Sequence, residues 1–283
     1  MGWKVNDLGD VRCAIDADAI DGYKDIHAHN FSIIGQYCAA IYDRVKVAAE
    51  SNDFLLMLGG DHSIPVGTVP AILSSRPQTG VLWVDAHADI NTTQTSPSGN
   101  MHGMPVAMLM GLEEMLPSLP PFDWFSKLDF PANRDGSKKT ACLSAEDLVY
   151  VGLREVDEGE RALIKDLGIK AFTMADVDRI GIGGVMKEVK DHFESRDLDI
   201  HCSFDIDAID PLYAPHTGTC VDGGLSRREA NFITEELHAS GRLRSLELVE
   251  VNPLKPSTSG DGTQKTIDLS LQIIGGALGR TIL

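Results

Sequence analysis

Val81-Leu-Trp-Val-Asp-Ala-His-Ala-Asp89 is the stretch that decides the fold of this chain. Four apolar residues bounded by polar ones are typical of a buried strand that ends at a site. If the chain stays extended beyond the apolar run, the two-residue period places Asp85, His87 and Asp89 on one face. Three such side chains at the end of a core strand are costly without a cation, so the pattern predicts a metal site. A solvated acidic loop with an incidental histidine is the alternative.

Two further stretches have the same form. Phe54-Leu-Leu-Met-Leu-Gly-Gly-Asp-His62 is an apolar run that ends in glycines and a histidine. Ile200-His-Cys-Ser-Phe-Asp-Ile-Asp207 is a third run, and it ends in Asp205 and Asp207. In an open α/β sheet, ligands bind beyond the carboxyl ends of the strands. We therefore expect the three strand ends to converge on one place.

The candidate ligands at these ends are four carboxylates and two imidazoles: His62, Asp85, His87, Asp89, Asp205 and Asp207. This set is too large for one tetrahedral zinc ion. It suits two divalent cations that share carboxylates. Because the set is rich in oxygen and contains no cysteine, it favours Mn²⁺.

The charge of the chain restricts its partners. Over 283 residues the formal net charge is −17, which argues against nucleic acid and anionic membranes, because both are bound by basic patches. The charge is compatible with a small cationic substrate, although solubility alone explains it equally well.

The cysteine pattern indicates a reducing compartment. The chain has five cysteines and no Cys-x-x-Cys spacing, so we expect no disulfides and a cytoplasmic location. The N-terminus lacks an apolar signal-peptide core, and no apolar run approaches membrane-spanning length.

Strand and helix patterns alternate along the chain. Strands are predicted at 54–58, 81–84, 148–152, 169–173, 200–204 and 245–251, and helices at 30–50, from 63, 102–112, from 157, 183–193, 226–239 and 264–279. This alternation predicts a three-layer α/β fold, with a mainly parallel sheet covered by helices on both faces. Prolines and polar turns at 115–140 indicate a surface excursion, with an insertion at about 125–140. We find no domain-sized linker and expect a single domain over 1–283.

Several spaced motifs together resemble those of the ureohydrolase family. They are Gly-Gly-Asp-His-Ser at 59–63, Asp-Ala-His-Ala-Asp-Ile-Asn at 85–91, Ser-Gly-Asn-Met-His-Gly at 98–103, Ser-Phe-Asp-Ile-Asp-Ala-Ile-Asp-Pro at 203–211 and Glu-Val-Asn-Pro at 250–253. Within that family, the 98–103 loop and Gly152-Leu-Arg-Glu-Val-Asp-Glu-Gly-Glu160 are similar to arginases rather than agmatinases. The resemblance runs from about residue 4 to the C-terminus.

The resemblance implies hydrolysis of L-arginine to L-ornithine and urea, as in arginine metabolism and the urea cycle. It implies two Mn²⁺ ions per chain and a hydroxide that bridges them. One ion would be held by His62, Asp85, Asp89 and Asp205, and the other by Asp85, His87, Asp205 and Asp207. A homotrimer is also implied.

The resemblance also implies catalytic roles for three residues. Asp89 would pass a proton from the nucleophile to the leaving amine. His102, which titrates near neutrality, would exchange protons with solvent; packing at a helix start is its alternative role. Glu250 would accept the substrate guanidinium through a bidentate contact, and a structural buried carboxylate is the alternative.

The substrate's amino-acid end would be held by neutral donors and one carboxylate. By resemblance, Asn91, Ser98 and Asn100 would bind the α-carboxylate, and Asp157 would accept the α-ammonium. Asp157 also fits a helix capping signature with Glu160, and both roles are compatible. Thr219 has a modest case for a site contact. Agmatine has no α-carboxylate, so these donors favour L-arginine.

The chain departs from the usual family pattern in three places. Relatives usually begin with a strand upstream of Lys4, and its loss should leave apolar surface and an unpaired sheet edge. The excursion near 125–140 is longer than expected, and Cys220 stands where a proline usually follows the Thr-Gly-Thr turn. Two alternatives to an active arginase therefore stay open: a catalytically idle, truncated arginase-like subunit, and an agmatinase-type guanidino hydrolase.

Overall fold

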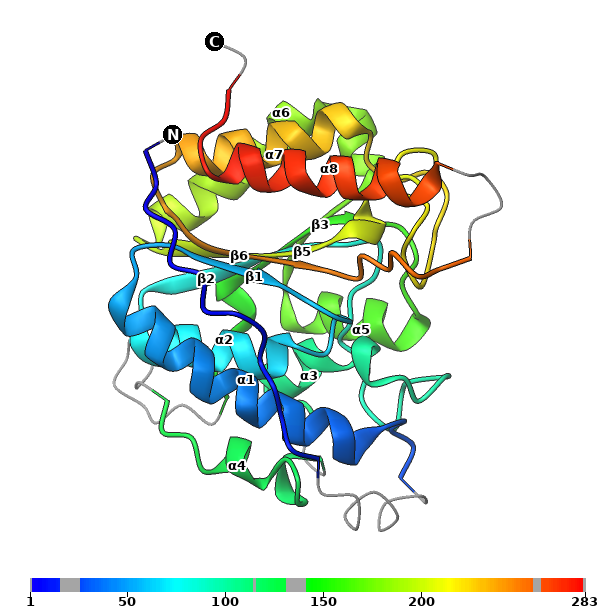
Figure 1. Ribbon diagram of the computed structural model, residues 1–283. Coiled ribbons are helices and arrows are strands. Elements are labelled where there is room, and N and C mark those ends of the chain that lie inside the picture. Colours follow the sequence, from blue (N-terminus) through cyan, green and yellow to red (C-terminus); the bar gives the residue numbers. More distant parts are fainter. Residues whose placement is uncertain (1, 16–25, 114–115, 131–140, 257–260, 282–283) are drawn as a thin grey trace.

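Six parallel strands form one continuous sheet in the computed structural model, which describes residues 2–15, 26–113, 116–130, 141–256 and 261–281 (Figure 1). The strands are β1 (Leu55–Leu58), β2 (Thr79–Val84), β3 (Leu148–Leu153), β4 (Lys170–Thr173), β5 (Asp199–Asp205) and β6 (Leu243–Val249). Their order across the sheet is β1-β6-β5-β2-β3-β4, and every neighbouring pair is parallel. The predicted α/β class and parallel sheet are confirmed.

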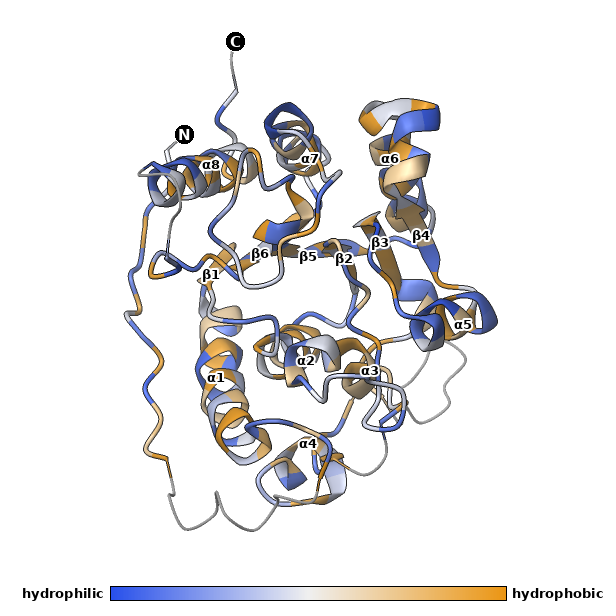
Figure 2. Ribbon diagram, turned by 90° about the vertical axis from the view of Figure 1, so that its right-hand side faces the viewer, coloured by the Kyte–Doolittle hydropathy of each residue, from blue (hydrophilic) through white to orange (hydrophobic). Residues whose placement is uncertain are grey.

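Helices cover both faces of the sheet, as expected for parallel strands joined by crossover connections (Figure 2). On one face lie α6 (Met174–Ser195), α7 (Arg227–Ala239) and α8 (Gly262–Ala277). On the other lie α1 (Phe31–Ser51), α2 (Pro65–Ser75) and α3 (Pro105–Leu109), with α4 (Asp123–Ser126) outside them and α5 (Glu158–Leu167) beside β4. None of the helices within the described ranges is long and apolar enough to cross a membrane.

Strand β2 shows how alternation builds the two cores. Val81 and Trp83 belong to the core beneath α1–α3, whereas Leu82 and Val84 belong to the core beneath α6–α8. All four side chains are fully buried. A strand buried on both faces therefore reads as a continuous apolar run, and its polar residues begin only where it leaves the sheet.

Strand β1 lies at an edge and is bonded to β6 alone among the described strands. Leu58 is 70% exposed and Leu56 is 39% exposed. The expected unpaired edge with apolar surface is therefore present. The extended residues 2–15 approach this side through contacts such as the Trp3 indole against the Phe54 ring.

The structure differs from the sequence expectations in three segments. The helix predicted over 102–112 is split into a 3₁₀ turn, Met101–Gly103, and α3, because Pro105 cannot continue a preceding helix. The helix predicted over 183–193 extends to α6, which bends at Gly181, where φ is +70°. The predicted surface excursion is wrong for its first half, because Leu116 and Phe122 are fully buried. Residues 131–140, which hold most of the expected insertion, lie outside the described residues.

The contact between α1 and α2 requires a glycine. A Cβ at Gly67 would lie 2.5 Å from the Cys38 carbonyl oxygen in α1, whereas a Cβ at Gly183, exposed in α6, would meet nothing closer than Phe232 at 3.7 Å. We expect Gly67→Ala to lower the free energy of unfolding by about 1–3 kcal/mol through overpacking. The same change at Gly183 should raise it by about 0.5 kcal/mol, because alanine favours helix. Urea unfolding of both variants tests whether the free energy of unfolding falls in one and rises in the other. Equal losses in both variants would contradict the close approach of α1 and α2 at Gly67.

Candidate metal centre and substrate pocket

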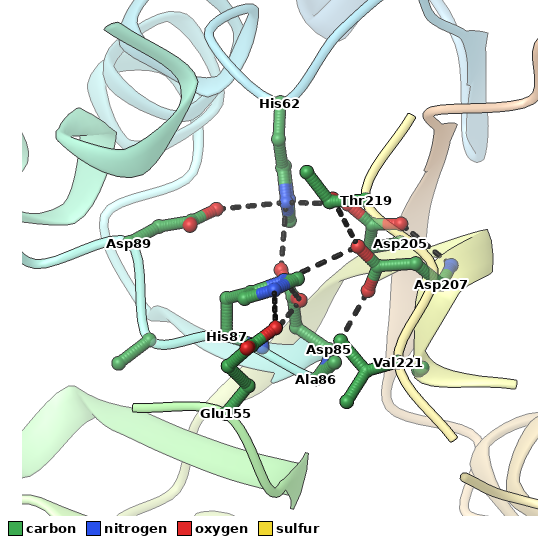
Figure 3. Close-up of polar contacts among 12 residues, drawn as sticks. His62, Asp85, Ala86, His87, Asp89, Glu155, Asp205, Asp207, Thr219 and Val221 are labelled. Carbon is green, nitrogen blue, oxygen red and sulfur yellow. Dashed lines mark hydrogen bonds and ion pairs between the residues drawn. The ribbon is translucent and has the colours of Figure 1, made fainter. Parts of the chain in front are cut away.

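Three strand ends deliver the six candidate ligands to one place (Figure 3). His62 follows β1, Asp85 follows β2, and Asp205 ends β5, with Asp207 two residues later. Because β2 and β5 are sheet neighbours, their carboxyl ends meet directly. The predicted convergence of the strand ends is therefore present.

The His62 imidazole faces three carboxylates. Its Nδ1 atom lies 2.8 Å from Asp85 Oδ2, 3.0 Å from Asp89 Oδ2 and 3.2 Å from Asp205 Oδ2. Nδ1 is buried and forms a well-aligned hydrogen bond with none of them. One ring nitrogen has a single hydrogen or lone pair and cannot serve three acceptors. A cation placed among the four groups would satisfy all of them.

A second group forms around His87. Its Nδ1 atom lies 3.2 Å from Asp207 Oδ2 and 3.3 Å from Asp85 Oδ1. Asp85 therefore turns one oxygen to each imidazole. The structure contains two sets of three ligand atoms that lie within 4.8 Å of one another, namely those of His62, Asp85 and Asp205, and those of Asp85, His87 and Asp207. Asp85 belongs to both sets, as a bridging ligand would.

Burial and mutual repulsion make three of the four carboxylates electrostatically costly, whereas at Asp85 burial is outweighed by contacts with His62 and His87, which lower its pKa. Asp85, Asp89, Asp205 and Asp207 are at most 6% exposed. Burial and then nearby aspartates raise the pKa of Asp89, Asp205 and Asp207. Burial alone would lower the pKa of His87, but its contacts with Asp207 and Asp85 raise it to about 12. A site that holds so much negative charge away from water suits divalent cations.

Two site residues adopt a left-handed backbone. The φ angle is +51° at Asp89 and +62° at Glu250. Aspartate tolerates this region through its short polar side chain, but glutamate rarely adopts it. Such backbone conformations persist where the surrounding structure enforces them, which is typical of functional sites.

Glu250 lies at the end of β6, between the His62 loop and the turn at Gly218. Its Oε1 accepts a hydrogen bond from the His62 backbone N–H at 2.9 Å, and a Cβ at Gly218 would lie 3.3 Å from Oε2. Burial raises the pKa of Glu250 to about 7. A cationic group beside this carboxylate would favour its ionised form.

Two of the residues expected to bind the amino-acid end of the substrate are hydrogen-bonded to each other. Asn91 Nδ2 donates to Asp157 Oδ2 at 2.9 Å, which brings the expected carboxylate donor next to the expected ammonium acceptor. Ser98 is exposed, and its Oγ accepts from the Asn100 backbone N–H at 3.2 Å. Asp157 also caps α5 together with Glu160, so the capping signature is present as well.

His102 and Thr219 complete the expected set. His102 lies in the 3₁₀ turn after the 98–100 loop, and burial lowers its pKa. The charges of His87, His62 and Asp207 act on the His102 ring. Thr219 donates its hydroxyl to Asp207 Oδ2 at 2.9 Å.

Sequence reasoning missed several residues that hold the ligands. Trp83 donates its indole N–H to Asp85 Oδ2 at 3.0 Å and stacks on the His62 ring at 4.1 Å. Glu155 Oε2 lies 3.3 Å from His87 Nε2. The alternation of side chains along a strand could have identified Trp83, because Trp83 lies two residues before Asp85 on the same face.

Arg154 was also missed, and its role is to hold the loop after Asp207. Its guanidinium donates to the backbone carbonyls of Asp207, Ala208 and Val221 at 2.7–3.2 Å. Contacts between segments so far apart in the chain left no local pattern that sequence reasoning could use.

The whole-chain comparisons agree with this geometry. A family model described as "Arginase family" matches residues 1–278. The arginase of Saccharomyces cerevisiae is 44% identical over 270 residues, which cover 93% of this chain and 75% of that protein. Human arginase-1 is 41% identical over 242 residues, which cover 85% of this chain and 70% of that protein.

Solved structures give the same picture of the fold. A crystal structure of arginase from Bacillus subtilis matches with a TM-score of 0.83 and 34% identity, covering 100% of this chain and 86% of that chain. The arginase of Bacillus caldovelox matches with a TM-score of 0.83 and 33% identity, covering 98% and 85%.

Proposed function

This chain belongs to the arginase family, and from that premise we propose that it hydrolyses L-arginine to L-ornithine and urea at a centre holding two Mn²⁺ ions. The observation that carries the proposal is the pair of ligand sets joined by Asp85. Four buried carboxylate side chains and two imidazoles match the oxygen-rich donors that Mn²⁺ accepts. When bound, two such cations supply a hydroxide nucleophile at neutral pH and neutralise the clustered carboxylates.

Glu250 would orient the reacting end of the substrate. A carboxylate is the natural partner of a guanidinium, because two parallel N–H···O bonds fix the plane of the cation. Glu250 is already held through Oε1 by the His62 backbone N–H, so its position relative to the ligands is set before substrate binds. This orientation would present the guanidinium carbon to the nucleophile.

Asp89 and His102 would move the protons. The Asp89 carboxyl group would accept the proton of the nucleophile and donate it to the leaving amine of ornithine. Asp89 Oδ2 lies 3.0 Å from His62 Nδ1, which places this carboxyl group beside the proposed ions. The His102 imidazole, at the start of the segment after the substrate loop, would exchange the proton with solvent.

The Asn91–Asp157 contact supports recognition of an α-amino acid. One Nδ2 hydrogen of Asn91 is bonded to Asp157 and the other is free to reach a carboxylate. Ser98 and Asn100 would add donors from the exposed loop, and Asp157 would accept the α-ammonium. Thr219 would act through Asp207, which it holds at 2.9 Å.

The proposed quaternary structure rests on family membership, and the proposed cellular location rests on the cysteines. Family membership supports a homotrimer built from a single catalytic domain over 1–283. The five cysteines are free thiols, which supports a reducing, cytoplasmic compartment. Sedimentation of the metal-loaded protein tests the trimer.

The decisive experiment loads the protein with Mn²⁺ and assays urea release from L-arginine and from agmatine. We expect about two Mn²⁺ per chain and urea from L-arginine at a rate far above that from agmatine, because unpaired recognition groups discriminate by roughly 10⁴-fold. Ser98→Ala should raise the KM for L-arginine roughly tenfold through one lost hydrogen bond to a charged group and leave agmatine unaffected. Preference for agmatine would refute the substrate assignment, and bound metal without urea would favour an idle subunit.

A further inference from the structure

A buried polar network continues from His62 into the centre of the sheet. It is built on the register of β5 and β6, which pairs His201 with Ser245 and Ser203 with Glu247. All four of these residues are 0% exposed. An ionisable carboxyl group inside a sheet core is costly, so its partners need an explanation beyond packing.

Glu247 is held by donors from three directions. Thr68 of α2 donates its hydroxyl to Glu247 Oε2 at 2.6 Å. The His201 Nε2 atom lies 3.2 Å from Glu247 Oε1. Ser203 is the register partner of Glu247 across β5 and β6, and its hydroxyl is one of the groups that lower the pKa of this carboxyl. Burial would raise the pKa of Glu247, but His201 and these hydrogen bonds lower it. Both Glu247 oxygens thus face donors, Thr68 at Oε2 and His201 at Oε1, so this carboxyl group acts as an acceptor of hydrogen bonds.

This fixes the direction of each hydrogen bond between Glu247 and His62. Because Glu247 only accepts, the Ser203 hydroxyl hydrogen points toward Glu247. The Ser203 oxygen then presents a lone pair to His62 Nε2, which lies 2.8 Å away. That nitrogen must carry a hydrogen, so a neutral His62 has its lone pair on Nδ1. Nδ1 is the atom that faces Asp85, Asp89 and Asp205.

We propose that Glu247 is a positioning residue of the metal centre, acting through Ser203 to keep the Nδ1 lone pair of His62 turned toward the cation. This inference rests on the proposed metal site and extends it to a residue that touches neither ligand atoms nor substrate. Partners that set the tautomer of a ligating histidine typically change metal affinity 10–100-fold when they are removed. Glu247 is thereby distinguished from Glu250, which lies three residues later and accepts from the His62 backbone N–H.

Two substitutions break the network at different points. Glu247→Gln places an amide NH₂ where only acceptors fit, so one of the three donors must turn away, and a reversed Ser203 hydroxyl would favour hydrogen on Nδ1. Ser203→Ala removes the acceptor for Nε2–H and leaves the tautomer free. Ser270→Ala is the matched control, because Ser270 is 6% exposed and its hydroxyl donates to the Thr266 carbonyl within α8, away from the network.

The test is Mn²⁺ titration calorimetry of the full chain, with thermal unfolding of the metal-free proteins alongside. We expect both network variants to bind Mn²⁺ about 10–100-fold more weakly than the wild type, and Ser270→Ala to bind within about twofold. Saturating Mn²⁺ should restore most of the kcat of Ser203→Ala, because a positioning residue acts on the occupancy of the site rather than on the reaction.

The possible outcomes separate this inference from the proposed function. Wild-type Mn²⁺ affinity in both network variants would overturn the role of Glu247 and leave the arginase proposal intact. An equal loss in Ser270→Ala would overturn it as well, because the effect would then be general to buried serines. A wild-type chain that binds no Mn²⁺ would refute the metal centre itself. If Glu247→Gln does not fold, Ser203→Ala decides alone, since it removes only one hydroxyl group.

Discussion

Asp85→Ala should empty the metal centre and lower urea release at least about a thousandfold, because a nucleophile at neutral pH depends on the bound cations. Asp85 is the one residue shared by both ligand sets. Its Oδ2 lies 2.8 Å from His62 Nδ1 and its Oδ1 lies 3.3 Å from His87 Nδ1. Loss of His62 or His87 leaves one of these two sets complete, whereas loss of Asp85 leaves neither. We expect bound Mn²⁺ to fall from about two per chain to below one, measured by elemental analysis after dialysis.

The Asp85 variant should be less stable than the wild type, and the difference should grow when metal is added. In the metal-free protein, contacts with His62 and His87 outweigh burial and lower the pKa of Asp85, so its removal takes away the shared partner of both imidazoles and the melting temperature should fall. With Mn²⁺ present, the wild type gains stability by ligand binding and the variant does not. Asp191→Ala on α6 is the control, because Asp191 is exposed and forms an ion pair with Lys187 on the surface of the same helix. A variant that retained two Mn²⁺ would contradict the bridging role.

Glu250→Gln should abolish productive arginine binding while leaving the metal in place. Removing one charged partner of a buried ion pair costs about 2–5 kcal/mol, which is a loss of roughly 30-fold to several thousandfold in kcat/KM. Glutamine keeps the size of the side chain and an oxygen for the His62 backbone N–H, so the ligand loop should stay in position. The main change is then that the substrate guanidinium has no carboxylate to pair with.

Steady-state kinetics and Mn²⁺ content of the same Glu250→Gln preparation give the measurement. We expect wild-type metal content with a large rise in KM. Glu194→Gln, an exposed substitution on α6, controls for the change of one charge. Loss of Mn²⁺ in the Glu250 variant would show that this carboxylate serves the metal rather than the guanidinium. Unchanged kcat/KM would indicate that Glu250 is a structural buried carboxylate and does not bind the substrate guanidinium.

Sequence reasoning succeeded for the strands because their signal is local. An apolar run buried on both faces, followed by polar residues, marks both a central strand and the point where it leaves the sheet. The run at Val81 and the run at Ile200 each end at the site for this reason. The prediction from the sequence was wrong at 115–130, where prolines indicated a surface loop but Leu116 and Phe122 are buried. Burial there depends on Phe122 packing against Phe31 of α1, a contact that leaves no periodic trace in the sequence.

The sequence by itself determined which side chains reach the site, because apolar strands lead into Asp85 and Asp205 and their carboxyl ends meet there. The expected extended stretch beyond Val84 is wrong, because β2 ends at Val84 and φ is +51° at Asp89, so a two-residue period does not place Asp85, His87 and Asp89. Only the tertiary structure decided how these side chains are held. The strand order places β6 between β1 and β5, so Glu250 comes beside His62 and Glu247 beside Ser203. Those contacts join segments more than 40 residues apart. They depend on which strands pair and in which register, and strand pairing is set by the packing of the whole sheet rather than by any local run of residues.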